Sequence, residues 1–462
     1  MATYDVVIIG AGPGGYVAAL RAAQLGMKVA VVERDSVGGT CLNWGCIPSK
    51  ALIRNAEVVS LFKNANFWGV NIEGMQVDFG AAVDRSRGVV DRMTRGVNYL
   101  FRKNGVDVVN GHARLRDAHT VAVEGSEELL EASTIIIATG ARPRSLPGLD
   151  VDGELVMTSR EALEARAMPA SAVFVGGGAI GCELAFVYNA YGVDTTIIEA
   201  LPRLLPLEDA EVSAEVERVF KRQGINCRPG THLVSHRRES DKAVLTVFTV
   251  DDEGEEEVLT DRVVVAVGIQ GNVEGLGLEE AGISTERGLI TVDEHLQTTA
   301  EGVYAVGDVN GKLALAHVAS AQGVYVVERL AGLNPTPLDH GLMPRAVYCQ
   351  PQVASFGMTE EAARDAGLAV RVGKFPFRPN GKALGAADYE GFAKVVVEEG
   401  SERILGAHLV GPEVTELLGE LSMTRLLEGT ARELGEMVHA HPSLSEVVKE
   451  AALAAVGEAL HG

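Results

Sequence analysis

Two cysteines, Cys41 and Cys46, are the residues whose type and spacing best suit covalent chemistry in this sequence. They stand just before Pro48, which favours a helix start, and a helix N-terminus lowers the pKa of a nearby thiol. The pair could also be half of a metal site, but no second Cys or His pair with ligand spacing lies nearby, so we expect no metal. Two buried structural thiols are the other interpretation. We favour a reactive dithiol because the pair directly follows a dinucleotide-binding pattern.

A histidine and a carboxylate near the C-terminus, His441 and Glu446, could supply the base that thiol chemistry needs. Thiol–disulfide exchange requires deprotonation of the attacking thiol, and a histidine steadied by a carboxylate suits this task. The spacing from Ser443 to Glu446 is also that of a capping box, with Pro442 as a helix-start residue. Glu446 therefore has two interpretations, and the cysteine pair favours the catalytic one.

The dinucleotide pattern begins with a β-branched run over residues 4–10, followed at once by a glycine-rich turn and an alanine-rich helical stretch. Gly10 permits the tight turn, Gly12 allows close approach to a pyrophosphate, and Gly15 allows the helix to pack on the strand. A second strand ends in Glu33, whose carboxylate can accept hydrogen bonds from ribose hydroxyls. These features predict one complete dinucleotide-binding unit.

The same unit occurs again later, with Gly176, Gly178, Gly181 and Glu199 in the equivalent positions. The offset is constant, since 176 minus 10 and 199 minus 33 both equal 166. Two bound dinucleotides are therefore expected. An acid at the end of the second strand favours a free 2′-hydroxyl, so Glu199 favours NAD over NADP.

Other patterns place the elements around these units. Residues 134–140 and 263–268 are apolar runs that end in Gly140 and Gly268, as buried strands do. From about residue 344 the dinucleotide pattern stops, and strands over 393–398 and 404–410 alternate with helices such as 413–427. We expect an α/β protein with two Rossmann-like domains and a C-terminal α+β domain. The expected segments are 1–148, 149–270, 271–343 (a return to the first domain) and 344–462.

Composition limits the functions. A chain of 462 residues exceeds one ordinary hydrophobic core, so several domains are expected. With 63 acidic and 41 basic residues the net charge is −22, which disfavours binding to nucleic acid or to anionic membranes. The N-terminus lacks a basic leader segment, no apolar run is long enough to span a membrane, and the five cysteines do not indicate a disulfide scaffold. We therefore expect a cytoplasmic protein.

The run from Gly39 to Lys50 resembles the signature of the pyridine nucleotide-disulfide oxidoreductases, and residues 47–52 are similar to that family's dihydrolipoyl dehydrogenase branch. Residues 439–446 resemble the family's C-terminal histidine motif, with Ser443 in place of threonine, and the resemblance covers essentially the whole chain. Two departures are Trp44 between the cysteines and the run 268–272, which lacks the arginine and proline usual there.

The resemblance implies roles for individual residues. The first unit would bind FAD and the second NAD. Cys41 would exchange with substrate, Cys46 would face the flavin, and His441 with Glu446 would serve as the base. The further residues implied are Lys50 near the flavin and paired with Glu183, Asp308 holding the ribityl or pyrophosphate region, and Ala316 along the flavin ring. Simpler interpretations are an exposed helix lysine for Lys50, a helix-surface acid for Glu183 and a turn cap for Asp308.

The implied activity is oxidation of protein-bound dihydrolipoamide with reduction of NAD⁺, as the E3 component of 2-oxoacid dehydrogenase complexes. The implied partners are a second copy of the chain, through a C-terminal dimerisation domain, and lipoyl domains of 2-oxoacid dehydrogenase or glycine cleavage complexes. One alternative is a related reductase of glutathione type, which Glu199 disfavours. Another is a non-catalytic complex subunit that retains the fold, and a colourless purified protein would favour it.

Overall fold

The computed structural model describes residues 2–250 and 254–461, which form two compact units. The first unit comprises the chain up to Leu52, Gly80–Arg144 and Gly268–His340, and the second comprises Ile53–Phe79, Ser145–Val267 and the chain from Gly341 onward. The four-part division at residues 148, 270 and 343 stays a proposal. No helix of the described residues is long and apolar enough to cross a membrane.

The first unit is built on a mixed sheet whose central strands are parallel. Its neighbours run in the order β3-β2-β1-β6-β5-β4, with β19 also pairing with β6. The strands are β1 (Ala2–Ile9), β2 (Val29–Glu33), β3 (Asp107–Asn110), β4 (Ala113–Leu115), β5 (Thr120–Val123), β6 (Leu129–Ile137) and β19 (Val303–Ala305). A pair formed by β7 (Ala141–Pro143) and β16 (Ile269–Gly271) and another by β17 (Thr285–Glu286) and β18 (Leu289–Ile290) complete its strands.

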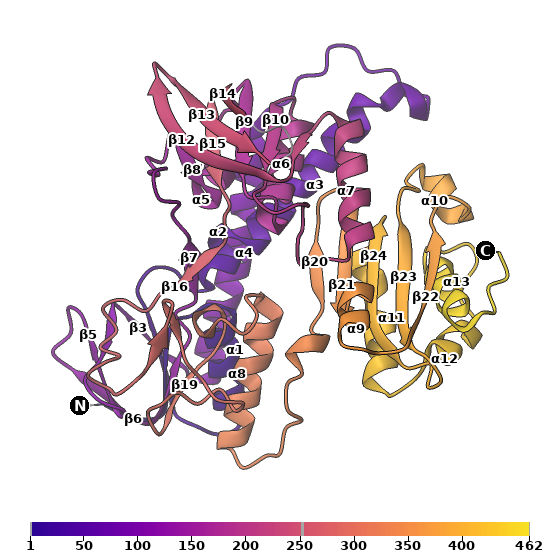
Figure 1. The fold of residues 1–462 in the computed structure, drawn as a ribbon. Coiled ribbons are helices and arrows are strands. Elements are labelled where there is room, and N and C mark those ends of the chain that lie inside the picture. The colour runs from indigo at the N-terminus through magenta and orange to yellow at the C-terminus, as the bar shows by residue number, and fades with distance from the viewer. Residues whose placement is uncertain (1, 251–253, 462) are drawn as a thin grey trace. The chain divides into compact units, whose positions relative to one another are not determined.

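Alternate residues of β1 belong to different cores, as period-two alternation requires. Val6 and Ile8 pack in a cluster with the helices α1 (Pro13–Gln24) and α8 (Ala316–Leu330), whereas Val7 and Ile9 pack in a second cluster on the other face. Helices α1 and α8 lie side by side (Figure 1). Because both faces are covered, the central parts of these parallel strands are continuous apolar runs, such as residues 6–9 of β1.

The second unit contains a fully parallel sheet in the order β11-β10-β9-β15-β8. Its strands are β8 (Val156–Thr158), β9 (Ser171–Val175), β10 (Asp194–Ile198), β11 (Asn226–Arg228) and β15 (Arg262–Val265). The associated helices are α5 (Ser159–Glu164), α6 (Ala179–Ala190) and α7 (Ala210–Gln223), and the antiparallel strands are β12 (Thr231–Glu239), β13 (Lys242–Thr249) and β14 (Gly254–Thr260).

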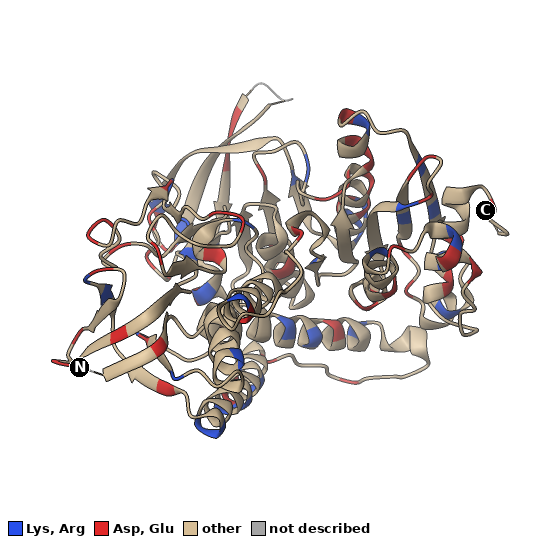
Figure 2. Ribbon diagram, turned by 90° about the horizontal axis from the view of Figure 1, so that it is seen from below, with Lys and Arg blue, Asp and Glu red and all other residues tan. Residues whose placement is uncertain are grey.

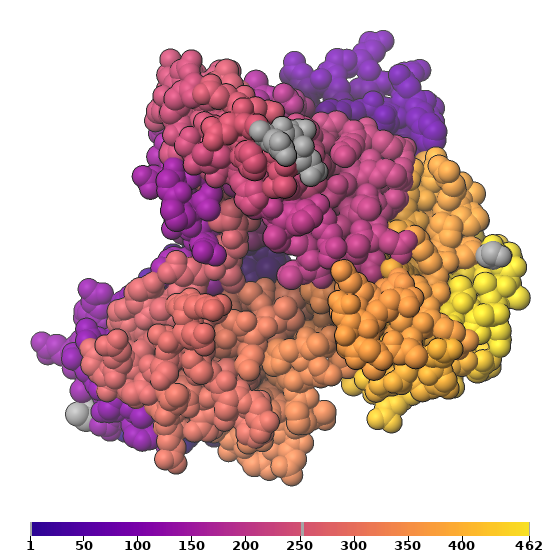
Figure 3. Space-filling view, viewed as in Figure 1, coloured from indigo at the N-terminus to yellow at the C-terminus, as the bar shows by residue number. Residues whose placement is uncertain are grey.

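The C-terminal part of this unit is an antiparallel sheet with helices, which confirms the predicted α+β character. Its strands β20, β21, β24, β23 and β22 lie in that order (Figure 1), and the surface of this C-terminal part is coloured orange to yellow in Figure 3. The strands are β20 (Arg345–Val347), β21 (Gln352–Gly357), β22 (Val370–Pro376), β23 (Phe392–Glu398) and β24 (Ile404–Gly411). The helices are α9 (Glu360–Asp365), α10 (Gly381–Ala386), α11 (Val414–Leu426), α12 (Ala431–Glu436) and α13 (Ser445–Val456).

Helix α13 packs directly on β22, and a glycine permits the contact. A Cβ at Gly373 would lie 2.0 Å from the carbonyl oxygen of Ala451. Any side chain there would therefore push α13 off the sheet. The expected strands at 393–398 and 404–410 and the expected helix at 413–427 match β23, β24 and α11 to within one residue at each end.

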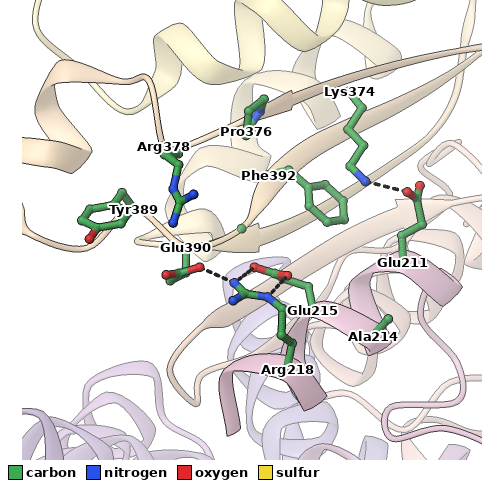
Figure 4. Close-up of a pocket in the computed structure, with 11 residues that line it drawn as sticks. Glu211, Ala214, Glu215, Arg218, Lys374, Pro376, Arg378, Tyr389, Glu390 and Phe392 are labelled. Atoms are coloured by element: carbon green, nitrogen blue, oxygen red, sulfur yellow. Dashed lines mark hydrogen bonds and ion pairs between the residues drawn. The ribbon is translucent and has the colours of Figure 1, made fainter. Parts of the chain in front are cut away.

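A cluster of ion pairs ties α7 to β22 and β23. Charges of both signs are interspersed along the chain (Figure 2), but here they converge. The ammonium of Lys394 is buried and lies 3.1 Å from Asp209, 2.7 Å from Glu211 and 2.8 Å from Glu360. Beside it is an open cleft of about 470 Å³, where Figure 4 shows Lys374 pairing with Glu211 and Arg218 pairing with Glu215 and Glu390.

Replacing Lys394 with methionine is expected to lower the free energy of unfolding by about 3–5 kcal/mol, because it leaves the buried Asp209 without its cation. A guanidinium titration followed by circular dichroism would measure the change. Lys374→Met is the matched control, since Lys374 pairs with the same Glu211 at a half-exposed position. That variant should lose at most about 1 kcal/mol. Equal losses in the two variants would contradict a special role for the buried pair.

Candidate active site

The first glycine turn joins β1 to α1 by two close backbone approaches. Gly10 has a φ of +104°, and a Cβ there would lie 2.4 Å from the carbonyl oxygen of Ala138. A Cβ at Gly15 would lie 1.8 Å from the carbonyl oxygen of Gly10. The fold itself therefore requires both glycines, one for backbone conformation and one for helix–strand packing.

The second turn, between β9 and α6, repeats this geometry. Gly176 has a φ of +111°, and its Cβ would lie 2.3 Å from the carbonyl oxygen of Ala266. A Cβ at Gly181 would lie 1.9 Å from the carbonyl oxygen of Gly176. The repeat seen in the sequence thus extends to the backbone contacts.

Neither backbone conformation nor packing requires the middle residue of each turn to be glycine. Gly12 and Gly178 have extended backbone conformations, with φ of −70° and −74°. A Cβ at Gly178 would meet no atom within 4 Å, and one at Gly12 would meet only the Cα of Gly39 at 3.9 Å. Both glycines precede the first turn of a helix, where backbone N–H groups without an intrahelical acceptor can bind an anion. The open space fits the close approach of a pyrophosphate.

The two acids also repeat, down to their hydrogen bonds. Glu33 accepts the N–H of Ala11 at 2.7 Å and that of Asp35 at 2.8 Å. Glu199 accepts the N–H of Gly177 at 2.7 Å and that of Leu201 at 2.8 Å, again 166 residues later, since 177 minus 11 equals 166. Each carboxylate oxygen retains a lone pair for a further donor. Both acids are therefore held in place beside their glycine turns as acceptors for hydroxyl groups.

A cleft of about 410 Å³ opens beside Gly10 and Glu33 in the first unit. Its lining also includes Arg34, Gly111, His112, Thr139, Arg142, Asn272 and Glu274, none of which the sequence analysis selected. The size and the mixed polar lining fit the nucleoside end of a dinucleotide.

One wall of this cleft is a clasp between distant segments. Asn272 donates to the carbonyl oxygen of Thr139 at 2.9 Å, and the Thr139 hydroxyl donates to the carbonyl oxygen of Asn272 at 2.8 Å. Arg142 pairs with Glu274 at 2.7 Å, and this hydrogen bond lowers the pKa of Glu274 to about 2. The clasp depends on the pairing of β7 with β16, so local sequence patterns could not reveal it.

Three other predicted residues follow strands, and a fourth begins a helix. Gly140 and Gly268 come after β6 and β15, with φ of +65° and +104°, in conformations that favour glycine. Asp308 follows β19, which pairs with β6, and burial raises the pKa of its carboxyl. Ala316 is the first residue of α8. Gly10, Gly140 and Asp308 thus lie near the carboxyl ends of neighbouring parallel strands, where ligands of such sheets bind.

The cysteine segment packs directly on the first glycine turn. Helix α2 (Gly39–Trp44) carries Cys41, and α3 (Cys46–Lys63) begins with Cys46. The N–H of Gly38 donates to the carbonyl oxygen of Ala11 at 2.8 Å, and a Cβ at Gly39 would lie 2.7 Å from the Cα of Gly12. The structure therefore places the dithiol segment against the turn that fits a dinucleotide.

The helix predicted to start at Pro48 begins two residues earlier, at Cys46. The N–H of Ser49 makes the first helical hydrogen bond, to the carbonyl oxygen of Gly45 at 3.0 Å. Pro48 therefore lies within the first turn, where the N–H groups have no intrahelical acceptor and the missing hydrogen of proline costs nothing.

The expected lowering of a thiol pKa does not hold for Cys41. Its hydrogen bond with Cys46 and, next, its burial raise the pKa of Cys41, although the charge of Lys50 opposes the change. The reduced pair therefore retains a proton on Cys41 at neutral pH. Burial and the nearby charges of the two cysteines also raise the pKa of Tyr16, a residue of α1 that the sequence analysis did not select.

The interpretation of Glu183 as a helix-surface acid is wrong. Glu183 lies in α6, is 5% exposed, and accepts the backbone N–H of Tyr348 at 2.9 Å. Lys50 is half-buried in α3 of the first unit. Its pairing with Glu183 stays a prediction.

His441 and Glu446 are in contact within the second unit. His441 Nδ1 lies 2.9 Å from Glu446 Oε1, and the histidine side chain is 79% exposed. The other carboxylate oxygen accepts the N–H of Ser443 at 2.9 Å. These two hydrogen bonds, the Ser443 one foremost, lower the pKa of Glu446. The carboxylate thus contacts one ring nitrogen of a histidine that is exposed at the surface.

The capping box proposed for this segment does not form. The N-cap of α13 is Leu444, without a side-chain cap, and the Ser443 hydroxyl contacts that of Ser445 at 3.0 Å. Glu446 nevertheless holds the N–H of Ser443. The carboxylate therefore braces the helix start and contacts the histidine at the same time, so the two interpretations do not exclude each other.

Comparison with known proteins gives one consistent answer. Residues 4–323 match the family model described as pyridine nucleotide-disulphide oxidoreductase, and residues 343–452 match the dimerisation domain of that family. The chain is 45% identical to dihydrolipoyl dehydrogenase of Bacillus subtilis over 100% of both chains, and 47% identical to that of Chlorobaculum parvum over 98% and 97%. A crystal structure of LpdA from Mycobacterium tuberculosis is similar, with a TM-score of 0.90 and 28% identity over 98% and 99% of the two chains. The chain belongs to the pyridine nucleotide-disulphide oxidoreductase family.

Proposed function

We propose that this protein is an NAD-dependent dihydrolipoyl dehydrogenase, the E3 component of 2-oxoacid dehydrogenase complexes. The observation that carries the proposal is the packing of the Cys41–Cys46 segment on the first glycine turn, which brings a dithiol to a site that fits a dinucleotide. Full-length relatives at 45% and 47% identity bear the name of this activity.

The chain uses FAD and NAD as its cofactors. We assign FAD to the first unit through Gly10, Gly12, Gly15, Glu33, Lys50, Gly140, Asp308 and Ala316. We assign NAD to the second glycine turn and the residues predicted with it, Gly176, Gly178, Gly181, Glu183, Glu199 and Gly268. When bound, FAD accepts the electron pair of the dithiol, and NAD⁺ carries that pair away as NADH. The open Cβ positions at Gly12 and Gly178 support a pyrophosphate in each half.

The sulfur chemistry begins with the Cys41–Cys46 disulfide. His441, oriented by Glu446, takes the proton of one dihydrolipoamide thiol, and the resulting thiolate attacks the sulfur of Cys41. The Cys41–Cys46 bond breaks, and Cys46 leaves as a thiolate. His441 next passes its proton to the departing sulfur of Cys41 and takes the proton of the second substrate thiol, whose sulfur attacks the first substrate sulfur and closes the lipoamide disulfide. Cys41 thus leaves as a thiol, and its raised pKa keeps that proton on Cys41 in the reduced pair.

The match of residues 343–452 to a dimerisation domain supports a homodimer. As further partners we propose the lipoyl domains of 2-oxoacid dehydrogenase or glycine cleavage complexes, because these carry the dihydrolipoyl group. A cytoplasmic location stays a prediction.

An anaerobic titration of the purified protein with dihydrolipoamide tests the proposal. We expect the visible absorbance of the flavin to change on addition of substrate, and NADH to form when NAD⁺ follows. A protein that reacts only with glutathione and NADPH, or that contains no flavin, would overturn the proposed activity.

Substitutions at the two middle glycines should each weaken the binding of a different nucleotide. Gly178→Ala is expected to raise the KM for NAD⁺ by about tenfold or more, because the methyl group occupies the approach of the pyrophosphate. Steady-state kinetics would measure this, and flavin content and thermal stability should stay unchanged because the new Cβ meets no protein atom. Gly12→Ala is the matched control, and it should weaken flavin binding instead. A raised KM for NAD⁺ in Gly12→Ala alone would reverse the assignment.

A further inference from the structure

We propose that Glu420 and His439 are positioning residues that hold the loop carrying His441, an inference that rests on the proposed function. The two histidines of this loop differ sharply in exposure, since the side chain of His439 is 3% exposed and that of His441 is 79% exposed. The buried histidine is therefore suited to anchor the loop, and the open one to meet substrate.

His439 is held at both ring nitrogens. Its Nδ1 lies 3.1 Å from the carbonyl oxygen of Met437, and its Nε2 lies 3.1 Å from Glu420 Oε2. A carbonyl oxygen only accepts, so Nδ1 carries a hydrogen. The second contact then needs one more hydrogen, held either by Nε2 of an imidazolium or by a protonated Glu420. Burial, the largest influence, raises the pKa of Glu420 and so favours a retained proton.

The anchor lies midway along an exposed segment. Residues 436–442 are all described by the structure, and every one of them except His439 is exposed. Helix α12 ends at Glu436 on one side, and on the other the amide of Asn380 donates to the carbonyl oxygen of Ser443 at 2.9 Å. The hydrogen bond between His439 and Glu420 on α11 therefore holds the stretch between these two points. It does so two residues before His441.

Glu420→Ala is expected to lower kcat with dihydrolipoamide by about 10- to 100-fold, as small displacements of a catalytic group do. Flavin content and the rate of NADH oxidation by ferricyanide should stay unchanged, because neither uses His441. Glu420→Gln should stay within about twofold of the parent protein, because its amide can donate to Nε2 of a neutral His439. His439→Ala should match Glu420→Ala, and the double variant should lose no more than either single change.

Glu450→Ala is the matched control, because it removes another carboxylate–histidine contact, that of Glu450 on α13 with His461 at 2.8 Å, without touching the loop. It should leave kcat unchanged. A full kcat in Glu420→Ala, an equal loss in Glu420→Gln, or parallel loss of ferricyanide activity would overturn the inference. Failure of the proposed function is a separate result, in which the parent protein itself does not oxidise dihydrolipoamide.

Discussion

Cys41→Ser should reduce turnover of dihydrolipoamide by about 10³-fold or more, because a serine hydroxyl can neither form the disulfide nor exchange with a substrate thiol. The purified variant should remain yellow, and NADH should still reduce its flavin. Steady-state assays with dihydrolipoamide and an anaerobic titration with NADH would measure the two properties.

Cys227→Ser provides the matched control. Cys227 is buried in β11, where its thiol lies 3.7 Å from the carbonyl oxygen of Ile225, and the same sulfur-to-oxygen change there should leave turnover intact. Cys46→Ser should be as inactive as Cys41→Ser. Normal turnover in either variant of the pair would refute the dithiol mechanism.

His441→Gln should slow the reaction with dihydrolipoamide by about 10²-fold or more, the usual loss for a missing general base. Glutamine can still accept or donate a hydrogen bond to Glu446, but it cannot take a proton from a thiol. Rapid-mixing measurements of flavin reduction by dihydrolipoamide would isolate this step. The rate of flavin reduction by NADH serves as the internal control and should not change.

Glu446→Gln should cause a smaller loss than His441→Gln, because the carboxylate orients the base without accepting the substrate proton. Since folding lowers the pKa of Glu446, its contribution to stability is complete above the unfolded pKa and disappears as the pH falls through the lowered folded pKa. The pair therefore stays intact at neutral pH. An unchanged rate in His441→Gln would leave Glu446 with only its bond to Ser443.

The repeated unit could be predicted from sequence because its parts are local. A strand, three glycines, a helix and a terminal acid follow one another within about thirty residues in each βαβ unit. The hydrogen bonds of Glu33 and Glu199 then follow from that spacing, and both match at the same offset. The α+β character after residue 344 was similarly visible in strand and helix patterns.

Other features depend on contacts between distant segments. The clasp of Thr139 with Asn272 needs strands 130 residues apart to pair, and the burial of Glu183 needs the segment around Tyr348 to cover α6. The dual role of Glu446 was missed for a different reason, since one carboxylate has two oxygens and the sequence shows only one residue. Spacing alone could not divide its oxygens between two partners.

The constant offset between the two halves ends just beyond their acids. The hydrogen bonds correspond at that offset as far as Asp35 and Leu201, after which one half continues into α2 with Cys41 and the other into α7, anchored through Asp209. The molecule thus contains the same nucleotide-binding βαβ unit twice, followed each time by a different segment. The position after Asp35 or Leu201 is therefore a natural splice point for transplanting the redox segment or for adding a reactive segment to the second βαβ unit.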